Sequence, residues 1–171
     1  IEFKPNLHEA WYDRGLSLSK LNRYQEAIAS YDKAIEVNPD LYKAWYDRGL
    51  SLDNLRRYQE AIASYDKAIE FKSDMHEAWN NRGASLHSLG RYQEAIASYD
   101  KAIEFNPSYT EAYFNKACCY ALLSKVEDAI EQLKKAIDLD PKYREQAKTD
   151  ADFDGIRSDK RFQVLVEDDN T

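Results

Sequence analysis

The chain has 171 residues, a net charge of −7 and a pI of about 5.1. This acidic balance argues against a nucleic-acid-binding protein, because such proteins usually concentrate Lys and Arg on one face. No apolar run approaches the roughly 18 residues that a membrane span needs, and no signal peptide is evident. The adjacent Cys118 and Cys119 cannot easily form a disulfide, and free thiols fit a reducing compartment. We therefore expect a cytoplasmic protein that binds neither nucleic acid nor membranes.

The most regular feature of the sequence is a period of 34 residues. An aromatic position, a small-residue position and an alanine position each recur at this spacing through four copies. They are Trp11, Trp45, Trp79 and Tyr113; Gly15, Gly49, Gly83 and Ala117; and Ala34, Ala68, Ala102 and Ala136. Such a period is typical of stacked supersecondary units, none of which can bury its apolar face alone. The core is therefore expected to be a strip that neighbouring units share.

Each unit predicts a pair of helices. In the first unit, apolar residues at three- and four-residue spacings predict one helix over residues 10–21 and a second over 24–35. Pro39 stops the second helix, because the residue before a proline is pushed out of the helical region. The small residues Gly15 and Ala27 are expected to let the two helices approach closely.

Polar residues mark the expected helix ends. An N-cap is predicted before each first helix, and three of the four caps are followed by a glutamate at capping-box spacing. The predicted caps are Asn6, Asp40, Asp74 and Ser108, and the glutamates are Glu9, Glu77 and Glu111. Asn22 and Gly90 suit the left-handed turn that ends a first helix, whereas Arg56 is less natural there.

Six positions of the first unit match the tetratricopeptide repeat (TPR) pattern in residue type and spacing. They are Trp11, Gly15, Ala27, Tyr31, Ala34 and Pro39. Arg14 departs from the usual leucine, and Ser73 replaces the proline expected at the entry of the third repeat. The chain thus resembles TPR proteins over residues 8–143.

The resemblance implies an all-α fold, a right-handed superhelix of four helix-turn-helix repeats followed by C-terminal capping helices. The first helix of each repeat would line a concave groove, where most known members bind peptides or helices of other proteins. The implied segments are residues 1–7 as the tail of a preceding repeat, 8–41, 42–75, 76–109 and 110–143 as the four repeats, and 144–171 as a C-terminal helical cap.

The two ends depart from the period. Residues 1–6 are similar to 69–74, so we expect a fragment of a longer array whose first repeat exposes an apolar face and favours end-to-end self-association. Residues 147–162 resemble the closing segment of TPR arrays in some bacterial, notably cyanobacterial, proteins.

In this closing segment, Phe153 and Ile156 are expected to plug the last repeat, and Ser158 to cap a final helix. The apolar stripe of that helix would consist of Phe162, Leu165 and Val166. A helix that binds a partner is the alternative to a lid.

The repeats differ from one another mainly on one helical face. Residues 23–36, 57–70 and 91–104 are identical, whereas the first helices vary on the side that a TPR superhelix turns towards its groove. This favours a recognition surface over drift at exposed positions. The candidate partner-binding residues are Tyr12, Asp13, Tyr46, Asp47, Asp53, Asn80, Asn81, His87, Phe114, Asn115 and Cys118.

The groove is expected to be acidic at its N-terminal end, through residues such as Asp13 and Asp47, and amide-rich and apolar towards Phe114. A protein segment with a basic stretch followed by an apolar anchor would complement it. Asn81 and Asn115 occupy the offset where an asparagine of many TPR proteins holds the ligand backbone.

Catalytic and metal chemistry is not evident. His87 could approach Cys118 on the next first helix, but no third ligand is apparent, and His76 lies about 16 Å from His87 along the helix. We expect no catalytic residue, no metal and no cofactor. The sequence indicates a non-catalytic protein-interaction scaffold, with a structural or self-assembling spacer in a longer repeat protein as the alternative.

Overall fold

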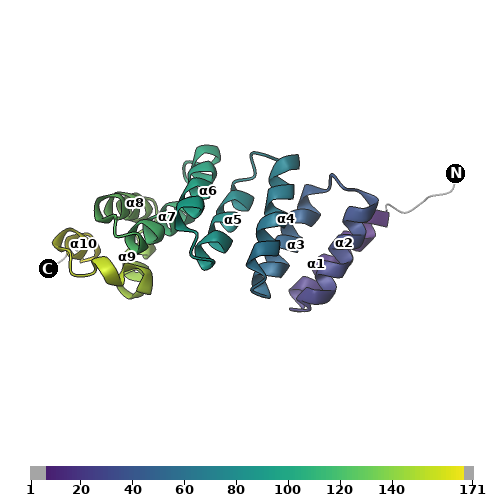
Figure 1. Cartoon of the computed structure of the whole chain (residues 1–171), viewed down its shortest axis with the longest axis horizontal. Coiled ribbons are helices and arrows are strands. Elements are labelled where there is room, and N and C mark those ends of the chain that lie inside the picture. Colours follow the sequence, from purple (N-terminus) through teal and green to yellow (C-terminus); the bar gives the residue numbers. More distant parts are fainter. Residues whose placement is uncertain (1–6, 168–171) are drawn as a thin grey trace.

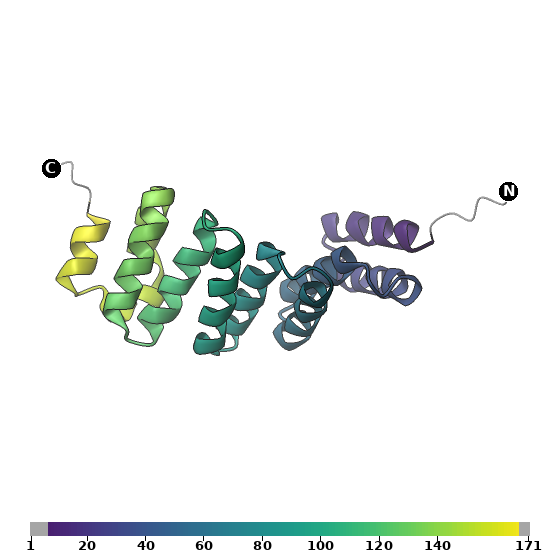
Figure 2. The same cartoon turned by 90° about the horizontal axis from the view of Figure 1, so that it is seen from above.

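The computed structural model describes residues 7–167, and within this range every regular element is a helix. Eight helices form four consecutive pairs. They are α1 (Leu7–Lys20) and α2 (Tyr24–Val37), α3 (Tyr42–Asn54) and α4 (Tyr58–Phe71), α5 (His76–Ser88) and α6 (Tyr92–Phe105), and α7 (Thr110–Leu122) and α8 (Val126–Leu139). Figures 1 and 2 show these pairs following one another along an elongated array, from α1 at one end towards α8 at the other. The all-α array expected from the sequence is confirmed.

Three short helices complete the chain: α9 (Lys142–Thr149), the 3-10 helix η1 (Ala151–Ile156) and α10 (Lys160–Val166). The expected tail of a preceding repeat falls on residues 1–6, which lie outside the described residues, and on Leu7, which begins α1. Between residues 7 and 167, no helix combines the length and the apolarity that crossing a membrane would require.

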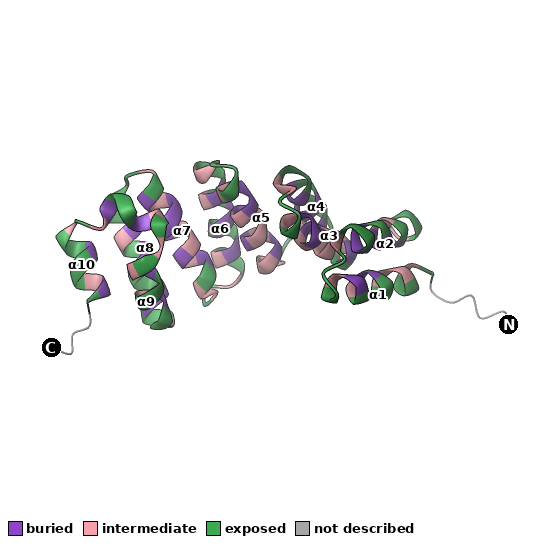
Figure 3. Ribbon diagram, turned by 90° about the horizontal axis from the view of Figure 1, so that it is seen from below, coloured by how far each residue is buried: buried purple, intermediate pink, exposed green. Residues whose placement is uncertain are grey.

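The core is a strip along the array, as expected. Buried residues lie on the helix faces that meet one another in each pair and between pairs (Figure 3). The buried clusters overlap successive repeats: Ala44 of α3 packs with α1 and α2, and Ile62 of α4 packs with α5 and α6. Each repeat therefore buries its apolar face only because a neighbour covers it.

A glycine and a tyrosine bring the two helices together in each of the first three pairs. Tyr65 is fully buried, and a Cβ atom added at Gly49 would lie 2.5 Å from its ring. Gly15 and Gly83 face Tyr31 and Tyr99 in the same way. The close approach expected from Gly15 is therefore present, and the space is filled by a tyrosine ring rather than by the facing alanine.

The fourth repeat solves the same packing problem differently. It carries Ala117 where the others have glycine and Leu133 where they have tyrosine, and both side chains are fully buried. A leucine side chain is smaller than a tyrosine ring, so it leaves room for the methyl group of an alanine. The two positions change together within one chain.

The aromatic residue that recurs every 34 residues also fixes the turn before its own helix. The indole Nε1 of Trp45 donates to the carbonyl oxygen of Pro39 at 2.9 Å, and that of Trp79 to Ser73 at 2.8 Å. Tyr113 replaces the tryptophan and still donates from its hydroxyl, to the carbonyl of Pro107 at 3.1 Å. A tyrosine suits this position because it retains the donor.

The left-handed turns between paired helices are present in all four repeats. Asn22 (φ 58°) and Gly90 (φ 72°) adopt them as expected, and so do Arg56 (φ 57°) and Ser124 (φ 57°). In each turn the next amide donates back into the first helix, for example Arg57 N to Leu52 O at 2.9 Å. This bond, which satisfies an otherwise free carbonyl, lets Arg56 tolerate a conformation that arginine rarely adopts.

The predicted N-caps are wrong for Asp40, Asp74 and Ser108, while Asn6 lies outside the described residues. The capping positions are instead Leu41, Met75 and Tyr109, none of which makes a side-chain capping bond. Leu41 and Tyr109 pack against the clusters of the preceding repeats. Burial of these side chains therefore sets the helix start, and it outweighs a cap worth about 1 kcal/mol.

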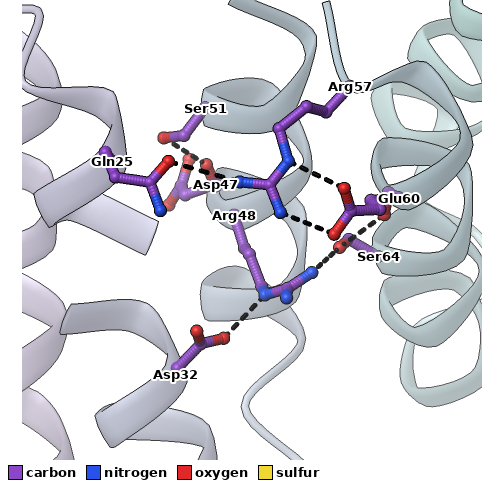
Figure 4. A network of polar contacts seen from close by, with 8 residues as sticks. All are labelled: Gln25, Asp32, Asp47, Arg48, Ser51, Arg57, Glu60 and Ser64. Carbon is purple, nitrogen blue, oxygen red and sulfur yellow. Dashed lines mark hydrogen bonds and ion pairs between the residues drawn. The ribbon is translucent and has the colours of Figure 1, made fainter. Parts of the chain in front are cut away.

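A cation joins successive repeats on the outer side. Arg48 of α3 donates to Asp32 of the preceding repeat at 2.7 Å and to Ser64 of its own repeat at 2.6 Å (Figure 4). Arg82 and Lys116 contact Asp66 and Asp100 in the same manner. The arginine or lysine that stands here in place of the usual leucine thus joins neighbouring repeats through polar contacts.

A second contact reinforces this junction. Arg57 is held by Glu60 through two short bonds and donates to Gln25 of the preceding repeat at 3.3 Å (Figure 4). Arg91 repeats the arrangement with Glu94 and Gln59.

The cap closes the last repeat. Phe153 (0% exposed) and Ile156 (3% exposed) pack into the cluster formed by α7 and α8, as expected. Phe162 and Val166 of α10 are also buried, and the partly buried Leu165 packs against the same cluster, which confirms the expected stripe. The predicted cap at Ser158 is wrong, because Asp159 accepts the capping bond from the amide of Arg161 at 2.8 Å.

We expect Gly49→Ala to destabilise the fold by about 1–3 kcal/mol, because the added methyl group overlaps the Tyr65 ring. The double variant Gly49→Ala/Tyr65→Leu reproduces the Ala117–Leu133 pair, so its loss should be smaller than the sum of the two single losses. Urea unfolding followed by circular dichroism measures this coupling. Gly155→Ala is the control, since a Cβ atom there meets nothing within 4 Å. Strictly additive losses would contradict the packing argument.

We expect Arg48→Met to lower the free energy of unfolding by about 1 kcal/mol, because it removes a half-exposed ion pair and a charge-assisted hydrogen bond. Arg14→Met is the matched control. Arg14 bonds Ser30 and lies over Trp11 as Arg48 lies over Trp45, but within residues 7–167 no carboxylate pairs with it as Asp32 pairs with Arg48. Equal losses for the two variants would show that the contact between repeats adds nothing.

Candidate partner-binding groove

The array curves towards its first helices. Among the described residues, α1 contacts α3, α3 contacts α5 and α5 contacts α7, while neighbouring second helices do not come as close together. The side on which elements lie closer together is the inside of a curve. The concave face is therefore formed by α1, α3, α5 and α7, as the TPR resemblance implied.

The predicted groove residues are brought together in pairs, one from each of two neighbouring repeats. The side chain at one position of a first helix meets the side chain one place further along the next first helix. The bonds run from Tyr12 Oη to Asp47 Oδ2 (2.7 Å), from Asn81 Nδ2 to Tyr46 Oη (2.9 Å) and from Asn115 Nδ2 to Asn80 Oδ1 (3.3 Å). We call this row of contacts the concave ladder.

The concave ladder explains part of the variation between repeats. When the acceptor Asp47 becomes the amide Asn81, its neighbour changes from hydroxyl donor to hydroxyl acceptor. Asn80 in turn donates to Glu111 at 3.1 Å. A polar bond between neighbouring repeats is therefore kept while one residue of the pair changes at each step, from Tyr12–Asp47 to Tyr46–Asn81 and then to Asn80–Asn115.

Asp53 forms a second contact between repeats. Its carboxylate accepts from Tyr65 Oη and from Ser85 Oγ of the next repeat, both at 2.6 Å. Burial raises the pKa of Asp53, although these two bonds act in the opposite direction. Asp53 thus serves mainly as a hydrogen-bond acceptor within the fold.

Three of the predicted residues are not open to a partner. Asn80 is fully buried, and Phe114 and Cys118 are 2% and 3% exposed. The Phe114 ring lies 4.8 Å from that of Tyr143 and 5.7 Å from that of Phe153. The expected apolar end of the groove is therefore already filled by the aromatic residues of the cap, which corrects the expectation of an open anchor site there.

The remaining predicted residues line an open surface. Asp13 is exposed, while Tyr12, Tyr46, Asp47, Asn81 and Asn115 are partly exposed. Glu9 and Glu111 are exposed on the same helices, where Lys20 and Lys43 supply the cations. Carboxylates outnumber cations on this face, so its open part is acidic.

His76 and His87 have different surroundings. The His76 ring lies against Tyr109 at 4.9 Å and contacts the Asn106 amide at 3.1 Å. His87 Nε2 lies 3.0 Å from Asp152 Oδ2 of the cap.

Cys118 faces the same part of the cap. Its thiol donates to Asp152, and its pKa is strongly raised by burial and by the charges of Asp150 and Asp152. Sequence reasoning missed both aspartates because no pattern in the closing segment shows where its loop will dock.

Models of the tetratricopeptide repeat match residues 12–76, 76–109 and 110–143. The chain therefore belongs to the tetratricopeptide repeat family. No curated protein matches the sequence.

Several solved structures share the fold. A MamA protein superposes with a TM-score of 0.82 at 21% identity, over 94% of this chain and 90% of that one. MamA from Desulfovibrio magneticus RS-1 gives 0.78 at 22% identity, over 84% and 81%. YrrB, described as a TPR protein with an unusual peptide-binding site, gives 0.72 at 23% identity, over 91% and 74%. At these identities the likeness shows the superhelical fold.

We expect Asp47→Asn to stabilise the protein at neutral pH. Burial raises the pKa of Asp47 above its usual 3.8, so the folded state binds the proton more tightly than the unfolded state. Stability therefore falls as pH rises from 3.8 through the raised pKa, and asparagine removes this loss while still accepting from Tyr12. The gain should be a few degrees in melting temperature at pH 7, on the order of 1 kcal/mol.

Melting curves recorded between about pH 4 and about pH 7 test this expectation, because a carboxyl group with a raised pKa loses its proton within this range. Asp13→Asn is the control, since Asp13 occupies the same place in the first repeat and is exposed. A destabilised Asp47→Asn variant at pH 7 would contradict the argument.

Proposed function

We propose that this chain is a non-catalytic interaction module that binds an extended segment of a partner protein along the concave face of α1, α3, α5 and α7. The observation that carries the proposal is the concave ladder. It holds a row of polar side chains on the inside of the superhelix, and their positions are fixed before any partner binds. Pre-ordered side chains lose less conformational entropy on binding, which favours affinity.

The amides of the ladder keep hydrogen-bonding capacity for a partner. An asparagine side chain can donate two bonds and accept two. Asn115 uses one N–H for Asn80, and Asn81 uses one N–H for Tyr46. The Oδ1 of Asn81 also accepts from Asn80 Nδ2 at 3.4 Å. A second N–H and at least one carbonyl lone pair remain on each amide, and a peptide backbone needs a donor and an acceptor of this kind. The half-exposed position of both side chains is compatible with such contacts.

The charge of the open surface favours a partner with basic residues. Asp13 and Asp47 lie on the inner side of the first two repeats, where Lys43 is one of few cations. Acidic walls of this kind mainly increase the association rate of a basic segment and make it sensitive to salt. The peptide-binding site named for YrrB supports the general class, since that protein has the same fold.

Self-association is the second candidate. Leu7, at the N-terminal end of α1, is 52% exposed, and a second copy of the chain could cover it. Multi-angle light scattering on the samples used for binding separates this candidate from groove binding.

We expect peptides selected from a random display library against the purified protein to be enriched in Lys and Arg. Binding of a labelled selected peptide, measured by fluorescence anisotropy, should weaken about tenfold in Asn81→Ala/Asn115→Ala, equivalent to 1.4 kcal/mol, through loss of two amides. Added salt should slow association. Gln93→Ala is the control, because Gln93 is an exposed amide on the second helix α6. Equal binding by all variants would remove the groove assignment.

A further inference from the structure

A small polar cavity lies where the cap meets the third and fourth repeats. It has a volume of about 190 Å³, and its lining includes His87 of α5, Asn115 and Cys118 of α7, and Asp150 and Asp152 of the cap. Three separate parts of the chain therefore converge on it. It lies beside the open groove and uses residues that the proposed peptide contacts, apart from Asn115, do not require.

The cavity gathers donor atoms of the kinds that bind transition metals. A thiol sulfur of Cys118 and carboxylate oxygens of Asp150 and Asp152 lie within 4.8 Å of one another. His87 Nε2 lies 3.0 Å from Asp152 Oδ2, so an imidazole nitrogen borders the same group. This nitrogen is buried, and the Asp152 carboxylate is its one neighbour of opposite charge among the described residues.

The charges in the cavity are not balanced by a permanent cation. Neither Lys nor Arg is among the lining residues of the described chain. Arg157 approaches Asp150 but donates to its backbone carbonyl, at 2.8 Å, rather than to its carboxylate. One carboxylate oxygen of Asp150 accepts the amide of Asp152 at 3.1 Å, which leaves the other oxygen for a ligand. A divalent cation would neutralise both carboxylates and could take the buried imidazole nitrogen as a further ligand.

The repeat scaffold does not itself require these donors. The position of His87 is Ser19 in the first repeat and Asp53 in the second, and the position of Cys118 is Ala84 in the third. His87 and Cys118 thus occur only in the two repeats that meet the cap. The packing that every repeat requires therefore does not explain why these donors are present.

We propose that Cys118, His87, Asp150 and Asp152 form a binding site for Zn²⁺ or a similar divalent transition metal. Sulfur and imidazole ligands with one or two carboxylates suit zinc, whereas Ca²⁺ and Mg²⁺ prefer oxygen ligands only. On binding, the S–H bond of Cys118 breaks, a zinc–sulfur bond forms, and the proton passes to the solvent. The metal would tie the cap to α5 and α7 and so brace the closed end of the groove.

The test uses the whole chain after removal of metal with a chelator. Titration with ZnCl₂ against a chromophoric chelator should show one site per chain, and excess ZnCl₂ should raise the melting temperature. CoCl₂ should give the near-ultraviolet band of thiolate-to-cobalt charge transfer, which only a sulfur ligand produces.

Cys118→Ala and Cys119→Ala form a matched pair. Cys119 is fully buried next in the chain but is not among the cavity residues. Cys118→Ala should abolish the cobalt band and weaken zinc binding more than about 100-fold, beyond the loss expected from outer partners alone. Cys119→Ala should retain the cobalt band and the zinc affinity of the wild type. His87→Ser and Asp152→Asn should each weaken binding, and they keep the test decisive if Cys118→Ala does not fold by circular dichroism.

Three results would overturn the proposal: no zinc-dependent rise in melting temperature of the wild type, zinc binding that survives in Cys118→Ala, or a cobalt spectrum without a sulfur band. The outcome is independent of peptide binding, because Asn81→Ala alters the groove without touching the metal ligands.

Discussion

The first three repeats depend on one contact, the insertion of a buried tyrosine into the space left by a glycine on the paired helix. Tyr65 against Gly49 shows why: the ring lies where any other side chain would begin. This contact sets the distance between paired helices and thereby the shape of the face that each pair offers its neighbour. Because no pair can cover that face alone, the stability of each repeat is shared with the next. In the fourth repeat a buried alanine and a buried leucine occupy the same two positions with different volumes.

Polar contacts between repeats have a different role from the apolar core. Arg48 and its equivalents join repeats on the outer side, where the second helices are identical, so the same contact recurs. On the inner side the concave ladder varies by one residue of the pair at each step, and a polar bond between neighbouring repeats is kept. The inner face can therefore diversify without breaking the stack, provided that each new pair still forms a hydrogen bond. This links the chemistry of the groove to the stability of the array.

The cap decides how much of the groove is available. Phe153 covers Phe114 and thereby closes the apolar end, leaving the acidic and amide-bearing repeats open. The same docking brings Asp150 and Asp152 to Cys118 and places a carboxylate beside His87. One short segment thus both limits the surface for a partner and creates the proposed metal site. A bound metal and a bound peptide would act on adjacent parts of the same surface.

The sequence by itself determined the family, the helix pairs and the strip-like core, because each follows from a pattern that recurs every 34 residues. It also indicated that Phe153 and Ile156 would close the array. It misplaced the N-caps, because burial of residues such as Leu41 was worth more than a local cap. Only the tertiary structure decided which groove residues remain open and which donors meet at His87. Those relations join residues from different repeats and from the cap, and their distances depend on how whole helices dock rather than on any local spacing.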